Sequence, residues 1–269
     1  MDDYDDKKVT DSIFEHYDYA KANGYKLIGI FLQGSQNYGL ETPFSDVDTK
    51  AITLPSFKSI ITNTKKTSKT LILPNNEHCD VKDIALMYEC FTKSNINFLE
   101  ILFTNFKIVD KSYKKEIDEL CSRAEEIALY DYKRLIDSMI GMACEKRKAL
   151  THPYPATLRK IEKYGYDGKQ LHHIMRLCEF LERLEQGESF RKCLMSKKSQ
   201  TLNILKIDPG LTLEEAIKTA DEYLAKLRAL RENSLRYKTS TQNRAIKEFL
   251  DDSLYRIMEK SVKHELHAA

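Results

Sequence analysis

The chain has 269 residues, of which 42% are hydrophobic and 31% are charged. This length accommodates one large domain or two modest ones, with enough apolar content for a substantial core. The charges nearly cancel, to a formal +2 at pH 7. That balance excludes a strongly basic DNA-coating protein and an acidic disordered tail, but it permits a local basic patch.

Cysteine usage and hydropathy indicate an intracellular protein. The six cysteines form no CxxC pair and share no regular spacing, so we expect reduced thiols rather than a disulfide framework or a zinc site. The N-terminus, MDDYDDKK, is acidic and lacks the apolar segment of a signal peptide. No apolar stretch approaches the roughly 18 residues of a membrane span. We therefore expect a cytoplasmic protein that does not enter membranes.

The first 110 residues carry both helix and strand signals. Apolar residues at helical spacing near 10–22 are followed by Asn23-Gly24, a typical C-terminal cap. Short apolar or alternating runs predict strands, and a PNN turn joins the last two into a hairpin. These runs are 25–32, 46–53, 70–73 and 77–81.

Two short helices and an edge strand complete this region. The segment DIALMYECFTKS begins with Asp83, a residue suited to cap a helix. INFLEILF predicts a second short helix, and FKIVD predicts a further strand at the edge of the sheet.

From residue 112 onward, a 3.6-residue periodicity replaces the strand signals. The periodic segments are 112–150, 157–186, 212–232 and 240–261. Thr212 and Glu215 form a capping box at the start of the third segment. The predicted fold is therefore α+β, with a small mixed sheet and flanking helices in residues 1–110 and an all-α domain in residues 111–269.

Residues 34–52 combine a glycine-containing turn with two aspartates. Gly34 and Ser35 follow a predicted buried strand, where a tight turn offers backbone N–H groups and a hydroxyl to phosphates. Asp46 and Asp48, at i and i+2 of a predicted strand, project from one face and repel each other unless a cation lies between them. Mg²⁺ prefers carboxylate and phosphate oxygens. Either fragment alone is typical of an ordinary turn, but their order and spacing favour nucleotidyl transfer.

These residues carry a resemblance to a known family. The pattern GSxxxGLxxxxSDxD is similar to the signature of the DNA polymerase beta nucleotidyltransferase superfamily, and more narrowly to its bacterial and phage predicted nucleotidyltransferases. The matching residues are Gly34, Ser35, Gly39, Leu40, Ser45, Asp46 and Asp48. Those proteins have a third carboxylate on a later strand. Because Cys79-Asp80-Val81 matches its context, the resemblance implies Asp80 as that carboxylate.

The resemblance extends further along the chain. The motif N-x-x-x-L-E-x-L-F is in place at residues 95–103. A family-like K-x-x-x-H-x-x-R-L helix sets Lys169, His173 and Arg176 on one face. Two cations and an imidazole suit a polyphosphate or an RNA backbone, although an ordinary exposed basic face is the alternative. His172 is expected to face elsewhere and to be structural.

The family implies a two-metal enzyme, dependent on Mg²⁺ or Mn²⁺, that transfers a nucleoside monophosphate from an NTP such as ATP to an acceptor hydroxyl. Asp46 and Asp48 would bind both metals, and Asp80 would complete the site of the metal that activates the acceptor and could assist deprotonation. The nucleotide-binding residues that it implies are Gly34, Ser35, Ser45, Lys169, His173 and Arg176. Residues 1–110 would be the nucleotidyltransferase catalytic domain, and residues 111–269 would complete the cleft for the nucleotide or the acceptor.

Several alternatives remain open at the level of sequence. The acceptor could be an RNA 3′ end, as in a tRNA-like molecule, a protein hydroxyl or a small molecule. A nucleotide sensor or antitoxin-like binding protein on the same fold, and an RNA-binding module, are the non-enzymatic alternatives. Retention of all three aspartates favours the enzyme. The sequence does not indicate the preferred base, the oligomeric state or the biological role.

Overall fold

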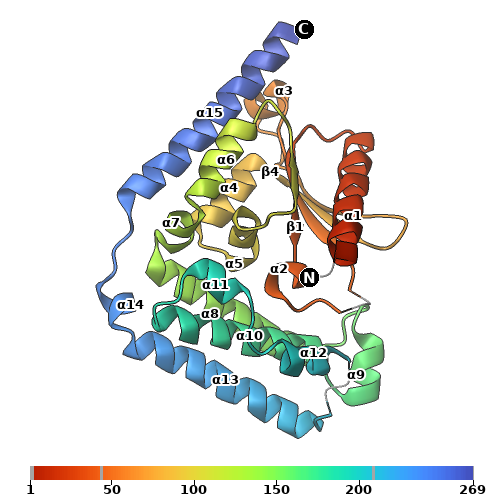
Figure 1. Cartoon of the computed structure of the whole chain (residues 1–269), viewed down its shortest axis with the longest axis vertical. Helices are drawn as coiled ribbons and strands as arrows, with labels where there is room; N and C mark the ends of the chain where they lie inside the picture. Colours follow the sequence, from red (N-terminus) through yellow and green to blue (C-terminus); the bar gives the residue numbers. More distant parts are fainter. Residues whose placement is uncertain (1–2, 43–44, 208–209, 269) are drawn as a thin grey trace. The chain divides into compact units, whose positions relative to one another are not determined.

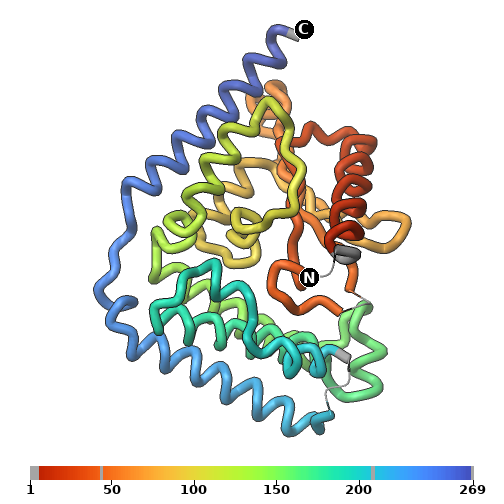
Figure 2. Tube along the Cα trace, viewed as in Figure 1, coloured from red at the N-terminus to blue at the C-terminus, as the bar shows by residue number. Residues whose placement is uncertain are grey.

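The structure is a computed structural model that describes residues 3–42, 45–207 and 210–268 (Figure 2). It divides into two compact units. The sheet unit comprises Met1–Asn37, Phe44–Tyr130 and Asn243–Ala269, and the helical unit comprises Tyr38–Pro43 and Asp131–Gln242. The sheet unit thus includes residues 111–130 and the C-terminal segment from Asn243, which the prediction had placed in the all-α domain.

In the described part of the chain, five strands form one mixed sheet. They are β1 (Leu27–Gln33), β2 (Asp48–Thr53), β3 (Ser68–Ile72), β4 (His78–Asp83) and β5 (Lys107–Val109). Their order across the sheet is β3-β4-β2-β1-β5. β2 and β4 run parallel, whereas the other neighbours are antiparallel. The start of β2 therefore lies beside the start of β4 and the end of β1.

Helices flank the sheet within its unit. They are α1 (Asp3–Ala22), α2 (Ser35–Tyr38, whose last residue groups with the helical unit), α3 (Phe57–Ile61), α4 (Ile84–Thr92), α5 (Ile96–Leu99), the 3₁₀ helix η1 (Glu100–Leu102), α6 (Lys114–Ser122), α7 (Ala124–Leu129) and α15 (Arg244–Ala268). α15 packs alongside α4 and α6 (Figure 1). Two ion pairs, Lys260–Glu116 at 3.1 Å and Arg256–Glu119 at 2.7 Å, join α15 to α6.

Alternation along the strands gives the sheet a largely apolar face and a second face, here called the polar face, on which polar residues stand beside buried Phe31 and Ile52. On the apolar face, Val9, Ile13 and Ala20 of α1 share a buried cluster with the central strands. The strand members of this cluster include Ile30, Leu32, Ala51, Cys79 and Val81. Alternate positions of the same strands point to the opposite face. Those positions carry Gln33, Asp48, Lys50, His78 and Asp80.

The helical unit is built around one buried helix. Its helices are α8 (Tyr132–Ala149), α9 (Leu158–Tyr164), α10 (Gly168–Glu185), α11 (Phe190–Leu194), α12 (Ser199–Ile207), α13 (Leu213–Asn233) and α14 (Leu235–Thr239). α10 packs against α8, α11, α12 and α13. Most of its apolar residues are buried, and Phe180 meets Phe190 edge to face with ring centroids 4.9 Å apart. None of the described helices is long and apolar enough to cross a bilayer.

The predicted α+β fold class is confirmed, and all five strands lie where the sequence indicated them. The predicted caps at Asp83 and Thr212 are also present. The periodic segment 112–150 contains three helices rather than one, and Gly165, with φ of 78°, ends α9 within the segment 157–186. α11 and α12 were not predicted, because one or two turns leave too few apolar repeats to reveal a period.

Gly29 and Gly141 provide a matched test of the packing. A Cβ on Gly29 of β1 would lie 2.8 Å from the Ile108 carbonyl oxygen of β5. Gly29→Ala should therefore displace β5 and lower the free energy of unfolding by about 1–3 kcal/mol. A Cβ on Gly141, in α8, meets no described atom within 4 Å, so Gly141→Ala should raise that free energy by up to about 1 kcal/mol. Urea denaturation followed by circular dichroism measures both. Equal effects of the two substitutions would contradict the close approach of β5.

Candidate functional site

A row of polar side chains crosses the polar face of the sheet. The strand register sets Lys50 of β2 beside Asp80 of β4, and Asp80 beside Thr70 of β3. Thr70 Oγ1 donates a hydrogen bond of 2.6 Å to Asp80 Oδ1. Lys50 Nζ lies 3.9 Å from Asp80 Oδ2. Each carboxylate oxygen of Asp80 therefore faces a donor from a neighbouring strand.

Lys50 is a buried cation in the middle of this face. Its side chain is only 5% exposed. Its ammonium donates a hydrogen bond to Gln33 Oε1 and lies 4.5 Å from the centroid of the Phe98 ring. Burial lowers the pKa of Lys50, whereas the charges of Glu100 and Asp80 act to raise it. Because a buried charge is costly unless it is partnered, Lys50 and the acidic groups around it stabilise one another.

Asp48 opens β2 on the same face. Standard strand spacings set its Cα atom about 8 Å from that of Asp80. The side chains of Asp48 and Asp80 are 36% and 32% exposed, so a ligand can reach both. His78 Nδ1 lies 3.5 Å from Asp48 Oδ1. This edge of the sheet therefore offers two accessible carboxylates beside a buried ammonium.

Asp46 lies before the strand rather than in it. A strand was expected over 46–53, but β2 begins at Asp48, so strand alternation does not orient Asp46. The residue is exposed, and its carbonyl oxygen accepts a hydrogen bond of 2.9 Å from Gln36 Nε2. The backbone of Asp46 is thus tied to Gln36 of α2.

The donor set suits one Mg²⁺ shared with a substrate better than a preformed metal cluster. No three His, Cys, Asp or Glu side chains among the described residues are grouped so that they could hold a metal ion. Asp80 is engaged by Lys50 and Thr70. Mg²⁺ commonly takes only one or two carboxylates and completes its coordination with water and substrate phosphates. Asp46 and Asp48, close in sequence and both reached by solvent, fit that requirement.

The Gly34-Ser35 turn lies at the same edge of the sheet. Gln33, directly before it, pairs with Asp48 across β1 and β2. Gly34 has φ of 91°, in the left-handed region that favours glycine. Its N–H lies 3.4 Å from Glu100 Oε2, and the Ser35 hydroxyl donates to Gln36 Oε1 at 3.3 Å. The turn after the buried strand is confirmed, and its binding of phosphate stays a prediction.

A buried polar network under β2 fixes the segment that carries the aspartates. His16 of α1 is fully buried. Its Nδ1 lies 2.8 Å from Thr49 Oγ1, and its Nε2 lies 3.0 Å from Glu77 Oε2. The other carboxylate oxygen of Glu77 accepts a hydrogen bond of 3.1 Å from the N–H of Val47, the residue between the two aspartates. The network on the apolar side of the sheet therefore fixes the position of residues 46–48, through the hydrogen bond to Val47.

In the helical unit, α10 carries the predicted basic face. Lys169 is exposed, His173 is partly buried, and Arg176 is only 4% exposed. The Arg176 guanidinium stacks on Tyr38, 3.7 Å from the ring centroid. Tyr38 ends the short helix that follows the Gly34-Ser35 turn. The Arg176 guanidinium is therefore held by its contact with Tyr38, independently of any ligand.

Both histidines of α10 are neutral near pH 7. Burial, reinforced by the charges of Lys206, Arg176 and Lys169, lowers the pKa of His172 to about 2. Burial also lowers the pKa of His173 well below its ordinary value. The positive charge of this face therefore rests on lysine and arginine. His172 was expected to face away, but it is buried four residues before Arg176, on the same side of the helix.

Three members of the sheet-edge site were not assigned from the sequence. Lys50 stands two residues after Asp48 in an alternating strand, and this spacing could have indicated a shared face. Glu100 belongs to the L-E-x-L-F motif, but its place beside Gly34 depends on the fold. Nothing in the sequence connects Gln33 with Lys50, because their contact arises from the β1–β2 register.

Comparisons with known proteins add little to this geometry. No protein-family model and no curated protein matches the chain. One solved structure that resembles it is a nucleotidyltransferase-like protein from Exiguobacterium sibiricum 255-15. The two share 14% identity over 86% of this chain and 76% of the other, with a TM-score of 0.30. A likeness at that score carries no argument about fold or function.

The buried network predicts the effect of pH on stability. Burial acts to raise the pKa of Glu77, but hydrogen bonds from His16, Val47 and Asn75 hold it below its ordinary 4.5. A lowered folded-state pKa stabilises the protein above the ordinary value, and that contribution is lost as the pH falls through the folded-state pKa. Glu77→Gln should lower the free energy of unfolding at pH 7 by about 1.5–3 kcal/mol and should weaken the loss of stability below pH 4.5.

Glu248 provides the control, because it is exposed on α15 of the same unit. Glu248→Gln should leave the unfolding free energy and its pH profile close to wild type, as surface substitutions usually do. Urea denaturation at pH 7 and at pH 4 measures both variants. A Glu77→Gln protein as stable as Glu248→Gln at pH 7 would contradict the proposed role of the network.

Proposed function

We propose that this protein is a Mg²⁺-dependent nucleotidyltransferase that moves a nucleoside monophosphate from an NTP to an acceptor hydroxyl and releases pyrophosphate. The observation that supports this proposal is the sheet edge itself. Two accessible carboxylates, Asp48 and Asp80, flank a buried ammonium, beside a glycine-containing turn at the end of β1. Carboxylates so close together favour the binding of a cation. A bound Mg²⁺ in turn binds phosphate oxygens.

Asp46 and Asp48 are the residues that would hold Mg²⁺ or Mn²⁺. When bound, such an ion polarises the α-phosphate of an NTP and lowers the pKa of an attacking hydroxyl. Asp80 would accept the proton of the acceptor hydroxyl or complete the metal site. Lys50 Nζ, 3.9 Å from Asp80 Oδ2, would help to hold that carboxylate in place.

The turn would supply contacts to the nucleotide, and basic residues of α10 are further candidates for contacts to phosphate. Backbone N–H groups at Gly34 and Ser35, together with Ser45, would bind phosphate oxygens in the manner of other tight turns. We extend the proposal to Lys169 and Arg176, whose charges suit the β- and γ-phosphates or an acceptor backbone. The other nucleotide-binding candidate of α10, His173, would act as a neutral hydrogen-bonding group, because its pKa is lowered.

The acceptor distinguishes the possible roles of such an enzyme. An RNA 3′ end, a protein hydroxyl and a small molecule all provide the nucleophile that this reaction needs. A nucleotide sensor on the same fold would bind NTP without transfer, and the accessible pair Asp48 and Asp80 favours the enzyme over it. Incubation with labelled NTP and separated cellular RNA, protein and small molecules would identify which class takes up the label.

Substitution of the aspartates tests the proposal. With each α-³²P-labelled NTP and Mg²⁺, the wild-type protein should label one acceptor fraction. Asp46→Asn and Asp48→Asn should each abolish labelling, because each removes one of the two carboxylates proposed to hold the ion. The metal-free thermal midpoint of both variants should be unchanged or slightly raised, since charge repulsion falls.

Glu248→Gln again serves as the matched control, because it also removes one carboxylate charge from the sheet unit, at an exposed position. It should label the acceptor as well as wild type. Full labelling by both aspartate variants would overturn the catalytic assignment. Tight NTP binding without labelling of any fraction by the wild type would favour the sensor.

A further inference from the structure

The polar face of the sheet continues past Asp80 toward a group of lysines. Lys82 follows Asp80 by two residues in β4, so both side chains stand on this face, with their Cα atoms about 7 Å apart. The Lys82 ammonium donates a hydrogen bond of 2.8 Å to Ser68 Oγ of β3 and lies 5.5 Å from the centroid of the Phe98 ring. Lys82 is therefore held next to the carboxylate that would meet the acceptor hydroxyl.

Two further lysines lie close to Lys82. Lys66, in the loop before β3, and Lys93, which caps the end of α4, both contact the Glu89 carboxylate, at 2.8 and 3.6 Å. Burial raises the pKa of the Cys90 thiol, and the charges of Lys82 and Lys93 act in the opposite direction, as expected if both ammonium groups lie near that thiol. Lys66, Lys82 and Lys93 form what we call the lysine cluster.

The lysine cluster has limited acidic company. Residues 82–93 contain two acidic side chains, Asp83 and Glu89. Asp83 is buried and caps α4, and Glu89 is shared by Lys66 and Lys93. Within the described part of the chain, Lys82 forms no ion pair with an acidic side chain, and its hydrogen-bond partner is a hydroxyl. Lys82 is thus a positioned cation without a carboxylate of its own.

The segment that leads into β3 adds positive charge but distributes it over both faces. Residues 57–73 contain four lysines and no acidic residue. All four lysines are exposed, and they are Lys58, Lys65, Lys66 and Lys69. Lys69 pairs with Val81, a member of the apolar cluster, so its side chain points away from the polar face. Lys69 therefore provides a matched lysine on the opposite face of the same two strands.

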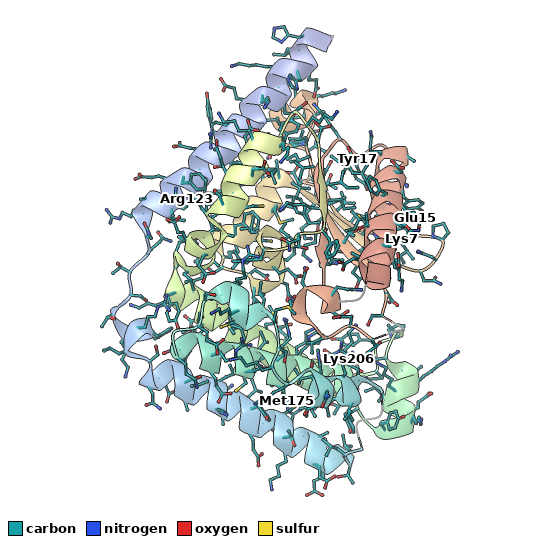
Figure 3. The ribbon with its side chains drawn as sticks, in the orientation of Figure 1. Lys7, Glu15, Tyr17, Arg123, Met175 and Lys206 are labelled. Carbon is teal, nitrogen blue, oxygen red and sulfur yellow. The ribbon has the colours of Figure 1, made fainter. Side chains whose placement is uncertain are left out.

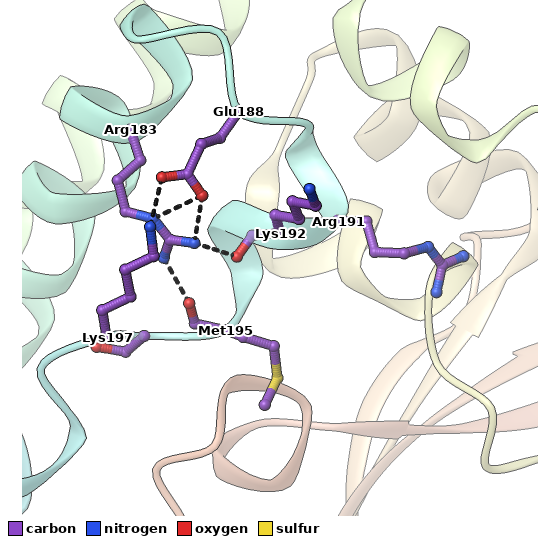
Figure 4. A pocket seen from close by; sticks show the side chains of 7 residues that line it. Arg183, Glu188, Arg191, Lys192, Met195 and Lys197 are labelled. Carbon is purple, nitrogen blue, oxygen red and sulfur yellow. Dashed lines mark hydrogen bonds and ion pairs between the residues drawn. The ribbon is translucent and has the colours of Figure 1, made fainter.

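Cations that line a pocket of the helical unit are engaged differently (Figure 4). That pocket has a volume of about 640 Å³. Arg183 binds Glu188 there at 2.8 Å, and Lys197 binds the same carboxylate at 2.6 Å. Those charges neutralise one another, whereas the charge of Lys82 faces the polar side of the sheet without such a partner.

We propose that the lysine cluster binds the phosphate backbone of a single-stranded RNA whose terminal hydroxyl meets Asp80, an assignment that rests on the proposed function and selects RNA among its acceptors. Lysine is a usual partner of phosphate oxygens, and such contacts position a nucleic acid without reading its sequence. The terminal oxygen would form the new bond to the α-phosphorus of the NTP as pyrophosphate leaves, and the hydroxyl proton would pass to Asp80. A series of cations beside that carboxylate suits a polymer that carries one negative charge per nucleotide.

Hydroxyl groups beside the lysine cluster favour RNA over DNA. Ser68 and Thr70 are exposed residues of β3 on the polar face. Each hydroxyl oxygen has two acceptor lone pairs, so each can accept a hydrogen bond from a ribose 2′-hydroxyl. That hydroxyl is the group by which a protein distinguishes RNA from DNA.

Fluorescence anisotropy with a labelled single-stranded RNA of about 12 nucleotides, in EDTA and without NTP, tests the docking alone. The wild type should bind this RNA. Lys82→Ala should make the slope of log K against log salt less steep by about 0.7, the contribution of one phosphate contact to a single strand, and should raise Kd about fivefold at about 0.1 M salt. Lys82→Arg should restore both values, because it keeps the charge.

Three further variants provide controls. Lys69→Ala should keep the wild-type Kd and salt slope. So should Lys7→Ala, an exposed position of α1 (Figure 3), since the apolar residues of that helix pack on the opposite face. Glu89→Gln should lower Kd on the order of twofold, because it removes a negative charge and releases Lys66 and Lys93.

Several outcomes would overturn the proposal. They are absence of RNA binding by the wild type, equal Kd values for Lys82→Ala and Lys69→Ala, and weaker binding by Glu89→Gln. A DNA strand of the same sequence and a polyglutamate peptide of the same charge should bind less tightly than the RNA, and equal affinity for either would overturn the assignment to RNA.

Labelling with NTP separates this proposal from the proposed function. Label that enters protein or a small molecule, with RNA neither bound nor labelled, would overturn the RNA surface and leave the nucleotidyltransferase in place. RNA binding that depends on Lys82, without labelling of any fraction, would support the RNA surface and contradict the transfer reaction.

Discussion

The buried ammonium of Lys50 is the constraint on which the candidate site depends. An ammonium that is almost inaccessible to water must have partners within the protein, and here they come from three separate segments. Gln33 lies on β1, Asp80 on β4, and Glu100 in the helical turn that follows α5. The side-chain charge that stabilises Lys50 is the same charge that a nucleotidyltransferase needs at this edge. Asp80 therefore serves both the stability of Lys50 and the proposed chemistry.

The two faces of β2 carry different parts of this site. One face carries Asp48 and Lys50 toward the polar side. The other carries Thr49, which joins His16 and Glu77 in the network that also binds the Val47 N–H. Because successive residues of a strand point to opposite faces, a one-residue change of register would exchange the two sets. Both the apolar core and the buried network therefore hold the aspartates in register.

Much of the fold could be predicted because local sequence patterns indicate its helices and strands. The buried run 25–32, the alternating run 46–53 and the capping residue Asp83 each predict their element without knowledge of the rest of the chain. The contacts of the site are different in kind. Lys50 meets Asp80 only because β2 and β4 are parallel neighbours, and Glu100 reaches Gly34 only through the fold. The helical period likewise predicted the face of α10 but not the neutrality of its histidines, which follows from burial by other helices.

We propose that a metal-bound NTP occupies the polar edge of the sheet. Anomalous diffraction from crystals grown with Mn²⁺ and an NTP that cannot be cleaved at its α-phosphate tests this claim directly. The expected result is a manganese peak coordinated by the Asp48 carboxylate and by phosphate oxygens, beside Lys50 and Asp80. Manganese and nucleotide bound elsewhere, with the Asp48 carboxylate uncoordinated, would contradict the claim.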